Sequence, residues 1–311
     1  MAMVWMQGWE VRSTSARFGQ WNSSGTVEPE QTAVFYQHPN GYGGGDTALA
    51  CASGAYLEAV NELTGLADSG QLQSAVYADS AWTAGGTILA LNDTSGAHIM
   101  EVRSVDADTN SRMAVLHGGL TIATTSTRIS VGAWHRLTLK YVSGANMTCT
   151  LYLNGNQIAE AATTRTTTNE AKGIRWGGAS GTTLYHDHST CWTGSDEAAL
   201  RGTWVQGLRP NGDNATGSFT PSTGGNLYSM LLFADNANHV TTVTDPDAFK
   251  LAMQNRSDVN AAWDPIIQGV QVQAIGRGEG SIDKAAVTME LSGTSVAGTT
   301  VQLSNVHGFV S

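Results

Sequence analysis

Short stretches of alternating apolar and polar residues recur along most of the chain. The clearest runs from Gly132 to Gly155 and contains a Trp, an alternating run, a polar hinge, a second alternating run and an Asn-Gly pair. A period of two places successive side chains on opposite faces of a β-strand, and Asn-Gly favours a tight hairpin turn. With residues 156–161 returning from that turn, the stretch predicts a three-stranded meander.

The first strand of this meander also predicts which face is buried. Its apolar side chains share one face and its polar side chains share the other: Leu137, Leu139 and Tyr141 against Arg136, Thr138 and Lys140. This pattern is typical of a sheet with one face on the core and one in water. Similar segments separated by Gly, Asn and Asp turn residues lie between residues 3 and 178. Many half-buried strands at short spacing predict two sheets packed face to face.

One segment departs from the strand pattern. From Asp245 to Trp263, a Pro follows an Asp that can cap a helix, and Phe249 and Met253 are spaced to share a helical face. The segment predicts a helix packed on the sandwich, with an ordered loop as the alternative.

Composition supports an all-β chain and narrows its partners. The 311 residues include 36 Gly but 6 Pro, and 14% are charged, with a formal net charge of −10. A chain this acidic and this sparsely charged does not predict a nucleic-acid partner. The N-terminal residues have no basic segment before an apolar core, and no apolar run reaches the length of a membrane span. We therefore expect neither a signal peptide nor membrane insertion.

The three cysteines, Cys51, Cys149 and Cys191, are odd in number and form no C-x-x-C pair. This predicts reduced, partly buried thiols in a protein that folds in a cytoplasm.

The meander resembles those of the concanavalin A-like and laminin G-like jelly-roll superfamily. The resemblance lies in Trp134, the two alternating runs and the Tyr-x-Asn-Gly turn at Tyr152 to Gly155, with a matching strand rhythm over residues 86–119. It implies a jelly-roll sandwich of two antiparallel sheets. We expect residues 1–200 to form this region and residues 201–311 to form a β-rich extension that completes the sandwich or packs on it.

The second half of the chain resembles a group of tailed-phage virion structural proteins. Two blocks carry the resemblance: Gly202, Val205, Leu208, Pro210, Asn211, Gly212 and Asp213, and then Ile267, Gly269, Val270, Gln271, Val272 and Ala274. A "TPSTG" loop follows the first block. The chain departs from that group where "LYHDHSTC" replaces the usual Asp-Asp pair.

Two sets of residues are candidates for metal binding. His186 and His188 would project from one face of a regular strand and could ligate Zn²⁺ or Ni²⁺, with Cys191 or Asp196 as a third ligand. Acidic turns could instead hold a structural Ca²⁺. The turn with Asp106, Asp108 and Asn110 lacks the Gly and Glu of a full calcium loop, and Asp is also favoured in turns without any ion. The other acidic turns contain Asn92, Asp93, Asp213 and Asn214.

Catalytic motifs are missing from the sequence. It has no E-x-D-x-x-E string of the concanavalin-like glucanases, no G-x-S-x-G and no phosphate-binding loop. Glu58 and Glu62 have the pattern of surface residues. We expect no enzymatic activity and no cofactor, although two carboxylates distant in sequence could still meet in a hydrolase.

Nine Trp residues are many for this length. Trp134, Trp176 and Trp204 lie in alternating strands and are expected in the core. Trp82, Trp192 and Trp263 lie among small polar residues, where an exposed ring could stack on a sugar or anchor a protein interface. Packing in the core or at its rim is the expectation for each one taken alone.

The phage resemblance implies a non-enzymatic structural protein on the virion surface, assembled in the host cytoplasm. A tail, fibre or adaptor module and a capsid decoration are both open, and a lectin that binds host-surface glycan is the alternative. Expected partners are other virion proteins and copies of the chain. Strands with uncharged outward residues, Gln271, Gln273 and Thr288, are typical of surfaces that pair with a second copy.

Overall fold

The computed structural model describes the chain in segments: residues 3–7, 9, 22–31, 47–60, 63, 66, 69–144, 146–164, 170–178, 181–194, 210–230, 239–244, 248–253, 274–276, 284–285, 288–291, 294–297, 301–302 and 308–310. The chain divides into two compact units. The first contains Met1–Glu10 and Trp21–Gln206, and the second contains Val11–Gln20 and Gly207–Ser311.

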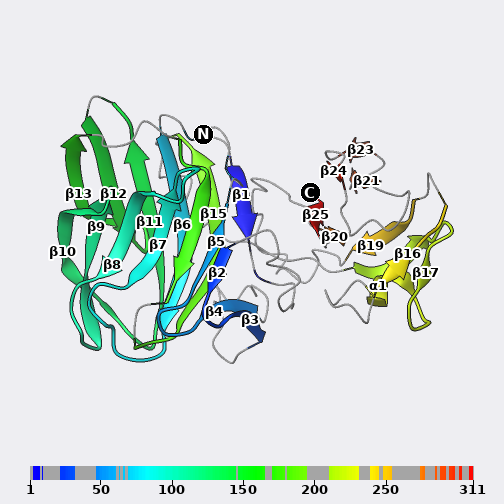
Figure 1. Cartoon of the computed structure of the whole chain (residues 1–311), viewed down its shortest axis with the longest axis horizontal. Coiled ribbons are helices and arrows are strands. Elements are labelled where there is room, and N and C mark those ends of the chain that lie inside the picture. Colours follow the sequence, from blue (N-terminus) through cyan, green and yellow to red (C-terminus); the bar gives the residue numbers. More distant parts are fainter. Residues whose placement is uncertain are drawn as a thin grey trace, which may run out of the picture. The chain divides into compact units, whose positions relative to one another are not determined.

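The first unit is built from two antiparallel sheets, which are the layers of blue, cyan and green strands in Figure 1. Sheet A has the strand order β13-β12-β11-β6-β15-β4-β3, and β1 also pairs with β15. Its strands are β1 (Met3–Gln7), β3 (Val27–Gln31), β4 (Thr47–Cys51), β6 (Ser69–Ala78), β11 (Trp134–Val142), β12 (Asn146–Leu153), β13 (Asn156–Thr164) and β15 (Leu184–Thr193).

Sheet B has the strand order β10-β9-β8-β7-β14-β5-β2. Its strands are β2 (Asn22–Ser24), β5 (Tyr56–Ala59), β7 (Thr87–Asn92), β8 (His98–Ser104), β9 (Asn110–His117), β10 (Leu120–Ser130) and β14 (Gly173–Gly177). The prediction of an all-β jelly-roll sandwich is confirmed by these two sheets.

The core lies between the inner faces of the two sheets. Trp176 of sheet B is fully buried, and its Nε1 donates a hydrogen bond to Oγ of Ser189 on sheet A at 2.9 Å. The ring of Trp9 meets the Trp176 ring edge to face, with centroids 5.0 Å apart. Residues far apart in sequence therefore pack together in the centre of the sandwich.

The predicted meander forms as β11, β12 and β13. Leu137, Leu139 and Leu151 are buried as the alternation requires, while Leu153 is half-buried near the turn. Asn154 and Gly155 both adopt positive φ, the conformation that a two-residue hairpin turn of this kind needs. The opposite face of sheet A is less exposed to solvent than its sequence pattern predicts, because Thr138, Gln71 and Gln73 are buried there.

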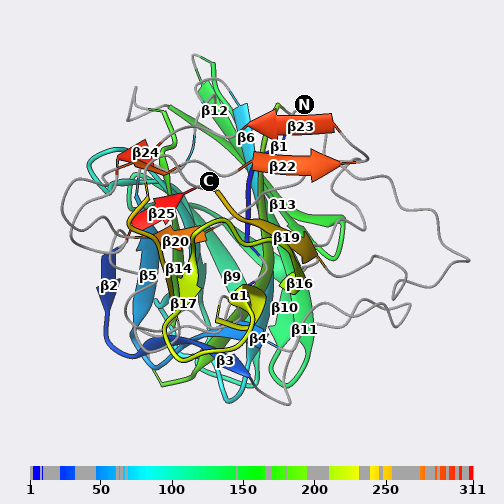
Figure 2. The same cartoon turned by 90° about the vertical axis from the view of Figure 1, so that its right-hand side faces the viewer.

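The described residues of the second unit form short paired strands, the yellow to red arrows in Figure 2, and a one-turn helix. Each strand has one partner: β16 (Pro210–Ala215) with β19 (Lys250–Met253), β17 (Thr220–Pro221) with β18 (Val240–Thr241), β20 (Ala274–Gly276) with β25 (Gly308–Val310), β21 (Lys284–Ala285) with β24 (Val301–Gln302), and β22 (Thr288–Leu291) with β23 (Thr294–Ala297). A one-turn helix, α1 (Leu227–Met230), accompanies β16. Gln271, Gln273 and most of the second phage-like block lie outside the described residues.

The helix predicted from Asp245 to Trp263 is wrong where the structure describes it. Lys250–Met253 is a strand, β19, which pairs with β16. Phe249 packs edge to face against Phe219, with ring centroids 4.6 Å apart. Pairing with a distant strand has overridden the local spacing of Phe249 and Met253. The remainder of the predicted helix lies outside the described residues.

All three cysteines are buried and free, which agrees with the expectation of buried thiols. Burial raises the pKa of Cys149 and of Cys191 to about 12 and raises the pKa of Cys51 further. Within the described residues, no helix has the length and apolar character of a membrane span.

Candidate functional site

A row of three aromatic side chains crosses the outer face of sheet A. Trp134 on β11 is opposite Tyr77 on β6, and Tyr77 is opposite Tyr185 on β15. The ring centroids are 5.6 Å apart for Tyr77 and Trp134 and 6.0 Å apart for Tyr77 and Tyr185. The rings tilt by 48° and 71° to each other, so they form a stepped surface. We call these three residues the aromatic row.

The aromatic row is placed by strand alternation. The residues next to the row on β6 and β15, Val76 and Leu184, are buried, and Leu137 is the first buried residue on the core-facing side of β11. Each of the three residues of the row is half-buried.

The next row along the same strands contains two charged residues with an alanine between them. It consists of Arg136, Ala75 and Asp187, paired across β11, β6 and β15. Asp187 is fully buried, whereas Arg136 is half-buried and stands two residues from Trp134 on the same face. Ala75 leaves little bulk between them. An aromatic surface thus has a guanidinium at its side, which suits a ligand with both apolar faces and hydroxyl groups.

The structure separates buried from half-buried Trp residues. Trp176 is buried as expected, but Trp134 is half-exposed in the aromatic row. Trp82 and Trp192 are 3% and 2% exposed, which agrees with packing in the core and not with an exposed ring. The Trp82 Nε1 donates to the backbone oxygen of Ile129 at 2.9 Å, so the polar N–H group of this buried side chain has an acceptor. Trp204 and Trp263 lie outside the described residues.

The two candidate metal-binding histidines, His186 and His188 on β15, contact different groups. Nε2 of His186 lies 2.9 Å from the Gly177 oxygen, and burial lowers the pKa of His186 to about 4. His188 has a positive φ of 46° at a β-bulge, and its Nε2 lies 3.6 Å from Oδ2 of Asp187. The bulge breaks the regular alternation on which a shared face depends. Cys191 is buried on the same strand, and Asp196 lies outside the described residues.

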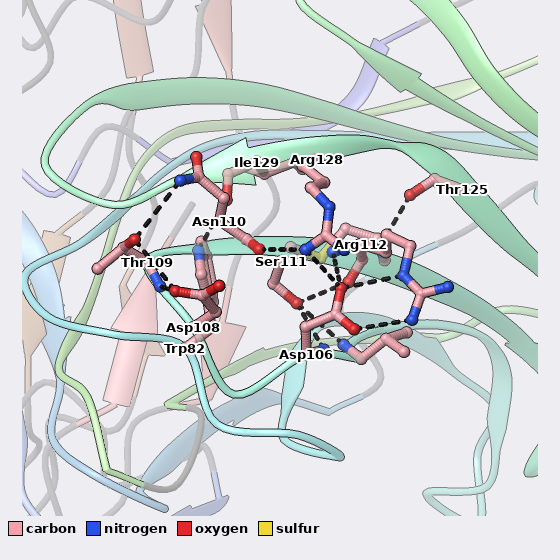
Figure 3. A network of polar contacts seen from close by, with 12 residues as sticks. Trp82, Asp106, Asp108, Thr109, Asn110, Ser111, Arg112, Thr125, Arg128 and Ile129 are labelled. Atoms are coloured by element: carbon pink, nitrogen blue, oxygen red, sulfur yellow. Dashed lines mark hydrogen bonds and ion pairs between the residues drawn. The ribbon is translucent and has the colours of Figure 1, made fainter.

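Asp106, a candidate calcium ligand, is held by two arginines (Figure 3). Arg112 donates from Nε and Nη2 at 3.0 and 2.7 Å, and Arg128 Nη1 donates at 3.1 Å. The hydrogen bonds from Arg112 hold the pKa of Asp106 well below its usual range. Asp108 accepts from the Thr109 backbone N–H at 2.6 Å. These carboxylates therefore accept hydrogen bonds that hold the loop before β9.

The other acidic turns also use their carboxylates locally. Asp93 accepts from the backbone N–H groups of Ser95 and Ala97, and Asp213 accepts from those of Leu227 and Tyr228 at the start of α1. No group of three or more His, Cys, Asp or Glu side chains with metal-binding geometry occurs in the part of the chain that the structure describes. A metal at any of these places remains a prediction.

Two carboxylates that the sequence did not single out as buried lie on the outer face of sheet B. Glu101 is fully buried. Burial alone would raise its pKa, but hydrogen bonds from His98, Arg103 and Thr87 lower it to about 2. Glu58, expected at the surface, is 8% exposed and accepts a hydrogen bond from Asn92. Two strands, β7 and β14, separate the strand of Glu101 from that of Glu58.

No protein-family model matches the chain, and no curated protein matches it in sequence. Solved structures are similar to it at low identity. They include a cellulose-induced protein, Cip1 (12% identity, TM-score 0.42, 56% of this chain and 92% of that one). They also include an endo-β-1,4-glucuronan lyase from the fungus Trichoderma reesei (15%, 0.40, 58% and 91%). A third is domain 4 of AbnA, an extracellular arabinanase from Geobacillus stearothermophilus, in complex with arabinotriose (12%, 0.42, 64% and 97%).

Proposed function

We propose that the sandwich is a non-catalytic glycan-binding module whose binding surface is the aromatic row. The observation that supports this function is the alignment of Trp134, Tyr77 and Tyr185 on three adjacent strands, each half-buried on an outer face. Aromatic rings bind the apolar faces of sugar rings, and Trp and Tyr also carry a polar edge for hydroxyl groups.

The neighbouring groups fit the same ligand. Arg136 carries hydrogen-bond donors on the Trp134 side of the row. Asp187, the carboxylate of the next row, is fully buried and therefore not placed to act on a ligand. The row thus offers stacking and hydrogen bonding without an accessible acid and base pair.

Trp134→Ala is expected to reduce glycan binding by about tenfold or more, because one stacked aromatic ring contributes on the order of 1–2 kcal/mol to recognition. Binding is measured by screening the purified chain on an array of neutral and acidic glycans and then titrating the best ligand by calorimetry. Leu120→Ala, at an exposed position of β10, is the matched control and should bind like the wild type. Equal binding by Trp134→Ala and the wild type, or no glycan bound by either, would refute the proposal.

We further propose that this module belongs to the surface of a tailed-phage particle, where the glycan would be a component of the host surface. The support is the resemblance of residues 202–213 and 267–274 to tailed-phage virion proteins. The proposal covers a tail, fibre or adaptor module as well as a capsid decoration, assembled in the host cytoplasm. Its partners would be other virion proteins and further copies of the chain, which residues 201–311 would contact.

Antibodies against the chain should label intact particles at regularly repeated positions in electron micrographs. The location of the label, on the tail or over the capsid, distinguishes the two settings. If neither labelling nor mass spectrometry detects the chain in the particles, the virion proposal is contradicted. The outcome of the glycan experiment is not affected.

A further inference from the structure

Arg175 occupies the middle of a polar row on the outer face of sheet B, the face opposite to the aromatic row across the sandwich. In register across β8, β7, β14 and β5 the row is Glu101, Ala90, Arg175 and Glu58. Trp176, the next residue on β14, faces the core. Alternation therefore directs Arg175 away from the core, where it is half-buried.

The guanidinium of Arg175 is held in place without an acidic partner. Its Cζ lies 3.6 Å from the centroid of the Tyr56 ring. Its Nε is buried and makes no hydrogen bond, and within the described residues no carboxylate forms an ion pair with it. Arg103 and Arg112, by contrast, each bind a carboxylate through two nitrogen atoms. A buried N–H group without an acceptor is costly, and the guanidinium of Arg175 also has no carboxylate to balance its charge in the part of the chain that the structure describes.

The acid directly opposite Arg175 is turned away from it. Oε1 of Glu58 accepts a hydrogen bond from Asn92, and it lies near the Gly96 turn at the other end of the strand pair. Glu101 already forms an ion pair with Arg103 and contacts His98. Arg175 is therefore the cation of this row whose charge no neighbouring carboxylate contacts.

The edge strand β2, two strands from β14, carries polar groups suited to sugar hydroxyls. Ser24 on the edge strand β2 is exposed and lies opposite Tyr56 in register, and Asn22 is exposed opposite Glu58. The half-buried Tyr56 ring holds the guanidinium, while these hydroxyl and amide groups stand at its side.

We propose that Arg175 binds the carboxylate of an acidic sugar. The planar guanidinium presents parallel N–H donors that match the two oxygens of a carboxylate, and stacking on Tyr56 fixes the plane of this fork before the ligand arrives. The site is separate from the aromatic row and does not depend on glycan binding there.

Titration of the full chain with sodium glucuronate, glucose and sodium acetate tests the proposal. Glucuronate and glucose share a ring and differ at the carboxylate, and acetate supplies the carboxylate alone. The Nε–H signal of Arg175 in ¹⁵N-resolved NMR spectra, assigned from its loss in Arg175→Lys, should shift with glucuronate and not with glucose. A larger affinity for glucuronate than for acetate, by about tenfold, identifies an acidic sugar as the ligand. Equal affinities would overturn the sugar assignment, and the absence of any shift would overturn the site.

Variants connect the binding to this arginine. Arg175→Lys keeps the charge but loses the fork, and Arg175→Gln loses both, so both should weaken glucuronate binding at least tenfold by calorimetry. Arg128→Gln removes an exposed arginine of β10 and should bind like the wild type. Trp134→Ala should also leave glucuronate binding unchanged, which separates this site from the aromatic row. Undiminished binding by Arg175→Lys would refute the role of the guanidinium fork.

Discussion

Trp176→Ala should lower the free energy of unfolding of the sandwich by about 3–5 kcal/mol, the usual cost of removing a buried Trp side chain. Trp176 is fully buried on β14, contacts the Trp9 ring edge to face and donates a hydrogen bond to Ser189. Its removal leaves a cavity between the two sheets and takes away the donor that Ser189 accepts from. Urea titration followed by circular dichroism measures the change.

Trp176→Phe separates packing from hydrogen bonding. Phe retains an aromatic ring against Trp9 but cannot donate to Ser189, so its cost should be clearly smaller than that of Ala. A loss below about 1 kcal/mol for Trp176→Ala would mean that the side chain does not join the two sheets as described.

The second large effect is expected at Leu139, where substitution by Ala should cost about 2–5 kcal/mol. Leu139 is fully buried in the centre of β11, between Leu72 on β6 and Leu151 on β12, which are fully buried as well. Because three strands surround this side chain, the core has little freedom to close over the missing atoms. The measurement is the same urea titration.

Leu120→Ala is a chemically identical control for Leu139→Ala, because Leu120 is 67% exposed. It should change the free energy of unfolding by less than about 0.5 kcal/mol. A similarly small effect for Leu139→Ala would show that the assigned strand faces are wrong.

The two proposed sites lie on the outer faces of different sheets, so each can be removed without the other. Trp134→Ala acts on sheet A and Arg175→Lys on sheet B, and neither residue is part of the core contacts of Trp176 or Leu139. Stability measurements on these variants therefore check folding independently of binding. A module with both sites would bind stacked sugar rings on one side and a carboxylated sugar on the other.

Local pattern determined the strands of the sandwich. The alternation at Leu137, Leu139 and Leu151 predicted their burial, and the Asn154-Gly155 pair predicted the hairpin, because both signals lie within a few residues of each other. The same local reasoning failed at Lys250–Met253, where helical spacing was outweighed by pairing with β16.

Only the tertiary structure decided which strands are neighbours. The aromatic row exists because β6 lies between β11 and β15, which brings residues 77, 134 and 185 together. Strand order and register depend on contacts between residues a hundred positions apart, and no local period encodes them. For the same reason the sequence did not reveal the position of Arg175 over Tyr56. The sequence by itself determined which side chains share a face of each strand, while the packing and order of the sheets decided which of those faces meet.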